Sequence, residues 1–207
     1  MNPPDWFRNT EWTPEIEEQF NTKLKRAKDK PQYLNIQAGL LTLHHPRIAL
    51  GLLDQYFEFA ENIFRSGAYV SQAHAWISLN DFENAVGSYR LAISREAEFP
   101  HYKTNAYVEF PFFVATQGLS KYFNEALSVL ASRESDLAFP LNHFKFHAAS
   151  ALILSEQGEP AKAVIHAQQA LSTAEANHSG FHNHPGLGLV GTSYTNLRTK
   201  LAKIASA

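Results

Sequence analysis

The sequence predicts an all-α protein made of stacked helical hairpins, and three observations lead to this prediction. A turn followed three residues later by an alanine and then by an aliphatic residue occurs four times. The four alanines, which lie 36, 41 and 37 residues apart, are Ala49, Ala85, Ala126 and Ala163. Apolar residues continue at helical intervals after each alanine, and another apolar helical pattern precedes each turn. The 15 Phe, 8 Tyr and 3 Trp of this 207-residue chain supply ample apolar area for a core.

Residues 1–31 are predicted to form an N-terminal extension and one helix, which runs from about Pro14 to Lys28. Thr13 is a favourable N-cap, and proline suits the first helical position. Acidic residues occupy the first turns and basic residues the last, which complements the helix dipole. Pro31 is expected to end the helix. Its apolar stripe consists of Ile16, Phe20, Leu24 and Ala27.

Residues 32–176 are predicted to form the helical repeats, each a first helix and a second helix joined by a few turn residues. The recurring alanines have a physical reason, because two helices pack at about 8 Å only where the contact residue is small. Large residues such as Trp76, Phe82 and Tyr89 then fill the space around that contact. The clearest pair of first helices matches Leu34, Ala38 and Leu41 with Tyr69, Ala73 and Trp76.

This alternation of small and large residues resembles the tetratricopeptide repeat family, whose pattern recurs over about 34 residues. The second unit matches best, through Tyr69, Ala73, Trp76, Ala85, Tyr89, Ala92 and a late Pro100. The fourth unit matches through Ala151, Leu154, Gly158, Ala163, Ala167 and Ala170. The stretch from Trp6 to Ala38 also resembles the N-terminal regions of uncharacterised bacterial repeat proteins. The resemblance implies a right-handed α-solenoid of about four helix-turn-helix repeats.

The third unit departs from this pattern. Pro111 falls inside its expected first helix, where a proline should either kink the helix or start it. The aromatic residues around it suit the core better than an exposed anchor for a partner. These residues are Tyr107, Phe110, Phe112 and Phe113.

Residues 177–207 are predicted to form a loop rich in glycine and histidine, followed by a capping helix from about Ser193. A repeat array needs such a cap because its terminal unit otherwise leaves an open apolar end. The apolar face of this helix consists of Tyr194, Leu197, Leu201 and Ile204.

Two features of that loop suggest chemistry at first sight. Residues 186–191 fit the dinucleotide-binding pattern GxGxxG, but no strand precedes them and no acidic residue follows them. We therefore expect a loop and no cofactor. His178, His182 and His184 are weak candidates for ligands of a transition metal, and solvated loop histidines are the favoured interpretation. No nucleophile and base can be placed together from the sequence, so the protein is predicted not to be an enzyme.

The charge balance argues against some partners. Eighteen Lys and Arg nearly balance 20 Asp and Glu, for a formal net charge of −2, whereas phosphate-binding proteins usually carry a basic excess. Nucleic acid and anionic membranes are therefore disfavoured as main partners. The start of the chain does not read as a secretory signal, and no apolar run is long enough to span a bilayer. The predicted location is the cytoplasm.

The family resemblance implies binding of a protein or peptide in a concave groove lined by the first helix of each hairpin. Carried onto this sequence, it predicts contacts from Asn35, Thr42, Val70, His74, Ser78, Lys145, Ala149, Leu152 and Glu156. Lys145 is the one residue of this set that stands out as a cation, so a less charged peptide, or part of this same chain, fits better than a carboxylate-terminated one. An adaptor or scaffold, with self-assembly open, is the predicted function. The alternatives are an enzyme or metal-binding protein that uses the histidine loop, and a helical-repeat RNA binder.

Overall fold

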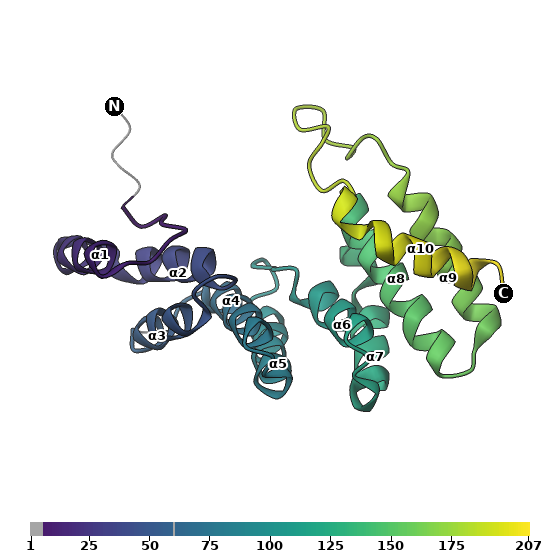
Figure 1. The fold of residues 1–207 in the computed structure, drawn as a ribbon, viewed down its shortest axis with the longest axis horizontal. Helices are drawn as coiled ribbons and strands as arrows, with labels where there is room; N and C mark the ends of the chain where they lie inside the picture. The colour runs from purple at the N-terminus through teal and green to yellow at the C-terminus, as the bar shows by residue number, and fades with distance from the viewer. Residues whose placement is uncertain (1–5, 60) are drawn as a thin grey trace. The chain divides into compact units, whose positions relative to one another are not determined.

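The computed structural model describes residues 6–59 and 61–207, and over those residues the chain consists of ten α-helices and short connections, without a strand (Figure 1). The prediction of an all-α protein is confirmed. Contacts divide the chain into two compact units, Met1–Ala106 and Tyr107–Ala207. The boundary falls between the second and third helix pairs, inside the segment predicted to form the repeats.

The first unit contains five helices, of which four form two hairpins. They are α1 (Pro14–Arg26), α2 (Lys30–Leu41), α3 (Pro46–Phe57), α4 (Arg65–Ser78) and α5 (Phe82–Glu98). Helix α2 packs against α3, and α4 packs against α5. Contacts of α4 with both α2 and α3 join the two hairpins.

Local capping explains where these helices begin. The backbone N–H of Ile16 donates to Thr13 Oγ1 over 3.3 Å, which confirms the predicted N-cap. Asp29 and Asp81 cap α2 and α5 in the same way. Pro31 lies in the first turn of α2, where its missing N–H costs no helical bond, and α1 ends before it at Arg26.

The segment from Trp6 to Trp12 packs against the core of the first unit. The rings of Trp6, Phe7 and Trp12 pack with Phe20 of α1 and Tyr33 of α2 at centroid separations between 4.6 and 5.5 Å. The buried side chain of Gln37 on α2 also binds the backbone of this segment. The Gln37 amide donates to the carbonyl of Asn9 over 2.7 Å and accepts from its backbone N–H over 3.0 Å.

The second unit contains the remaining helices. They are α6 (Ala106–Thr116), α7 (Phe123–Arg133), α8 (Pro140–Glu156), α9 (Pro160–Ala174) and α10 (Thr195–Ala205). Helices α8 and α9 form a long hairpin, which turns at Gly158 with φ of 77°. Helix α10 lies on both of them, with Leu201 fully buried and its other predicted apolar positions packed against the same cluster. The predicted C-terminal helix and its face are confirmed.

The four repeated alanines are all fully buried, as close packing at these positions requires. They are Ala49, Ala85, Ala126 and Ala163, each in the first turn of its helix, α3, α5, α7 or α9.

Helix α6 begins five residues before Pro111, so the alternative that this proline starts the helix is wrong. The start is set upstream, where Thr104 Oγ1 accepts from the backbone N–H of Ala106 over 3.2 Å. Tyr107, Phe110 and Phe113 are buried, as expected of core residues.

Candidate functional site

One concave surface of the first unit lies along α2 and the start of α4. A cavity of about 610 Å³ lies between α2 and the segment that joins α3 to α4. Its lining consists of Asp29, Pro31, Gln32, Asn35, Ile36, Tyr56, Phe59, Glu61, Asn62 and Phe64. A second hollow of about 330 Å³ shares Asn35 and Ile36 with the first and continues between α2 and α4. Its other lining residues are Arg8, Gly39, Leu40, Gly67 and Ser71. The two hollows together are called the α2/α4 groove below.

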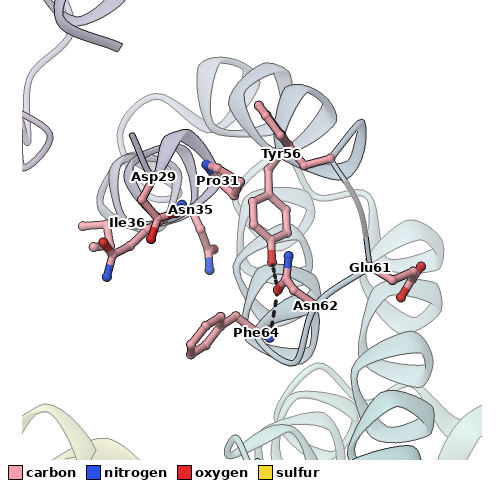
Figure 2. Close-up of a pocket in the computed structure, with 10 residues that line it drawn as sticks. Asp29, Pro31, Asn35, Ile36, Tyr56, Glu61, Asn62 and Phe64 are labelled. Atoms are coloured by element: carbon pink, nitrogen blue, oxygen red, sulfur yellow. Dashed lines mark hydrogen bonds between the residues drawn. The ribbon is translucent and has the colours of Figure 1, made fainter. Parts of the chain in front are cut away.

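The wall of the groove opposite α2 is held by a hydrogen-bonded side chain. Tyr56 Oη donates to Asn62 Oδ1 over 2.8 Å, and Asn62 Oδ1 also accepts from the backbone N–H of Phe64 over 2.9 Å (Figure 2). Burial raises the pKa of the Tyr56 hydroxyl, so this group stays a neutral donor near neutral pH. Asn35 faces this wall from α2 (Figure 2).

Arg65 fixes the same connection from the other side. Its guanidinium donates to the carbonyl oxygens of Phe57 and Phe59 over 3.1 and 2.8 Å, and it pairs with the Glu61 carboxylate over 2.7 Å. Arg95 of α5 also forms an ion pair with Glu61. Because these bonds order the wall before any partner arrives, a ligand would spend little free energy on ordering it.

The groove is close to neutral and partly apolar. The carboxylate of Glu61 pairs with two arginines, and the other two charged residues of the lining, Asp29 and Arg8, have opposite signs. Two large apolar side chains remain exposed at its edge, Phe64 with 52% and Leu40 with 39% of its surface in solvent. This lining suits an uncharged ligand with apolar side chains better than an anionic one.

Small residues allow α2 and α4 to approach each other along the groove. A Cβ added to Gly39 of α2 would lie 3.4 Å from Ser71 Oγ of α4, which is van der Waals contact. A larger residue at Gly39 would therefore press on the facing helix and narrow the second hollow.

Of the five residues predicted as contacts in the first unit, one, Asn35, lines the groove. Thr42 is buried, and its hydroxyl donates to the Gly39 carbonyl over 3.1 Å, so it finishes α2 and does not line a surface. Val70, His74 and Ser78 are partly buried on α4, and they are not among the residues that line either hollow.

The residue missed on α4, Ser71, had no signal in the sequence. The burial of both Ala38 and Ala73 supports the 35-residue register of the first helices, which pairs Asn35 with Val70. Ser71 lines the second hollow because it faces Gly39 across the two helices, and that contact depends on how the helices pack.

In the second unit the burial of three predicted contacts requires a correction. Ala149 and Leu152 are buried, so their side chains are not at the surface for a partner to contact. Lys145 is also buried, with its Nζ 2.6 Å from Glu109 Oε1 and 5.3 Å from the centre of the Phe112 ring. Its charge is therefore already compensated within the unit. Glu156 is exposed at the end of α8.

The histidine loop does not gather metal ligands. The ring of His178 accepts from the backbone N–H of Gly180 over 2.9 Å, and the ring of His182 contacts the side chain of Asn183 over 3.2 Å. Within residues 6–59 and 61–207 no group of three or more His, Asp or Glu could hold a metal ion.

The glycine-rich segment in the same loop has a packing role. Gly188 has a φ of 67°, and a Cβ added there would lie 2.7 Å from Phe139 Cβ. Its carbonyl accepts from the backbone N–H of Leu141 in the first turn of α8 over 2.8 Å. The Phe139 ring also stacks on Phe181 of the loop, so the glycine lets the loop close over the start of α8.

No family model matches the chain, and no curated protein or solved structure is significantly similar to it. No helix in the part of the chain that the structure describes has the length and apolar character needed to cross a membrane.

Proposed function

We propose that this chain is a non-catalytic adaptor of the tetratricopeptide-like kind, a right-handed solenoid of helical hairpins that binds an extended peptide segment of a partner protein. The α2/α4 groove is the binding site in this proposal. The observation that supports it is that α2 lines two adjoining hollows of low net charge, the smaller of which is also lined by α4, the first helix of the next hairpin.

The size and chemistry of the groove favour a peptide. Its larger hollow, about 610 Å³, falls within the range of about 300–1,000 Å³ that is usual for ligand sites, which is room for one or two apolar side chains. The side-chain amides of Gln32 and Asn35 can each donate to and accept from a peptide backbone. Phe64 and Leu40 offer apolar area that a partner would remove from water, at about 25 cal/mol per Å².

The test is selection of random peptides on the full chain by phage display, followed by anisotropy titrations of the enriched peptides. Leu40→Ala removes an exposed side chain and should change folding stability little, whereas Phe64→Ala also removes an edge-to-face contact with Tyr102. Each should weaken binding about tenfold or more, which corresponds to about 1.4 kcal/mol. Asn35→Ala tests whether the side-chain amide of Asn35 contacts the peptide backbone.

Ile165→Ala provides the matched control, since it removes an equally exposed aliphatic side chain from α9. Peptides that bind the groove variants and the control with equal affinity would refute the groove as the site. Salt-sensitive retention of the chain on heparin, combined with no peptide enrichment, would favour the RNA-binding alternative.

A further inference from the structure

Two histidines meet between the long helices of the second unit. His147 on α8 and His166 on α9 place their Nδ1 atoms 3.0 Å apart, with ring centroids 5.3 Å apart. Both rings are partly buried, and Phe146 packs against both at centroid separations of 5.0 and 6.3 Å. This contact links two helices of the same hairpin through side chains that titrate near physiological pH.

The contact depends on where the protons are. A hydrogen bond between two Nδ1 atoms needs one ring to carry its proton on Nδ1 and the other to present a lone pair there. A first added proton can go to Nε2 of the donor ring, which keeps the bond but places a charge in a half-buried site. A second proton must go to the accepting Nδ1, so two N–H groups and two positive charges would then face each other.

The surroundings offer limited compensation for that charge. His143, one turn before His147 on α8, adds a further titratable ring of the same sign, while Glu134 favours the charged form of His166. On α9 the closest preceding cation, Lys162, forms an ion pair with Glu159 over 3.2 Å.

The pKa values of the two rings also favour the pair in which both rings are neutral. Burial lowers the pKa of His147 to about 4, with further lowering by His166 and His143. Burial also lowers the pKa of His166, against the opposing effect of Glu134. In the unfolded chain both rings would have ordinary values near 6.5.

We propose that His147 and His166 form an acid-sensitive latch that holds α8 against α9 when both rings are neutral and releases the hairpin when they are protonated. The latch does not depend on the proposed peptide groove, which lies in the first unit. Helix α10 packs on both α8 and α9, so opening the hairpin would also loosen the C-terminal helix.

The sign of the pH effect follows from proton linkage. Since the unfolded chain binds protons at the two rings more readily than the folded chain does, acid favours unfolding. The stabilisation is fully present above about pH 6.5 and is lost progressively as the pH falls towards 4.

The experiment compares melting temperatures of the full chain at pH 7 and pH 5. Wild type should lose about 5 °C more over this interval than the double variant His147→Gln and His166→Gln, which cannot take up the two protons. A matched double variant, His182→Gln and His184→Gln, removes two exposed loop histidines and should behave as wild type.

A second measurement keeps the test decisive if the latch variant does not fold. Titration of the histidine rings of wild type by NMR should show His147 still largely neutral at about pH 5.5, where an imidazole of ordinary pKa is mostly charged. The latch is refuted if both interhelical rings titrate with ordinary pKa values. It is also refuted if the melting temperatures of wild type and of both double variants fall by the same amount between pH 7 and pH 5.

Discussion

The tight contact between α8 and α9 can be tested at Ala163, which is fully buried near the start of α9. Replacing it with leucine adds three carbon atoms at a position that has no exposed surface. Helices that pack through a small residue must then separate, or neighbouring side chains must leave their preferred rotamers. Ala163→Leu therefore tests whether the recurring alanine sets the distance between the helices.

The loss of stability expected for Ala163→Leu can be estimated. Overpacking of a close-packed interior typically costs about 1–3 kcal/mol. The second unit has about 100 residues, and for a domain of that size each kcal/mol lowers the melting temperature by about 4–8 °C. We expect a loss of at least about 4 °C in the transition of the second unit.

Ala161→Leu is the control, because Ala161 lies in the same first turn of α9 but is exposed. Leucine and alanine have similar helix propensities, so this change should stay within about 0.5 kcal/mol. The assay is thermal unfolding of both variants followed by circular dichroism. Equal melting temperatures for the two variants would contradict the argument that a small side chain is needed at Ala163.

Three further substitutions probe the second unit by thermal or urea unfolding. Gly188→Ala should cost about 1–2 kcal/mol or more of folding stability, because its φ is positive and the new Cβ would clash with a neighbouring phenylalanine. The control, Gly186→Ala, meets open space and should be nearly neutral. Equal effects of the two variants would show that the loop does not close as described. Leu201→Ala should cost about 2–5 kcal/mol by leaving a cavity under α10, and an unchanged urea midpoint would show that α10 does not cap the unit. Lys145→Ala should destabilise the unit by leaving Glu109 without its cation, yet leave the affinity for any selected peptide unchanged; a loss of affinity without a loss of stability would restore Lys145 as a binding residue.

The helical elements of this protein are well predicted by its sequence because their signals are local. Thr13 caps the first helix, the alanines recur at the packed positions, and Leu201 lies on the apolar face of the last helix, all as residue spacing predicts. The helix around Pro111 is the exception. Its start depends on Thr104, a residue that carries no strong pattern of its own.

The candidate site is less predictable because it depends on contacts between distant residues. Lys145 looks like a free cation in the sequence, but its partner Glu109 is 36 residues away on α6. The meeting of His147 and His166 depends on the register of α8 against α9, which the spacing of the alanines does not determine to within one residue. Ser71 likewise lines the groove because it faces Gly39 on the neighbouring helix, a contact that the 35-residue register of the first helices does not show.

The bonds between Asn9 and Gln37 bear on how the chain folds as it is synthesised. The ribosome produces Asn9 first and Gln37 twenty-eight residues later, so the early segment stays unpaired until α2 has emerged. From then on the buried amide has its partner, and the aromatic cluster of Trp6 and Tyr33 can close over it. A nascent chain arrested after α5 should therefore already protect the segment from Trp6 to Asn9 from protease, long before the C-terminal helix is made.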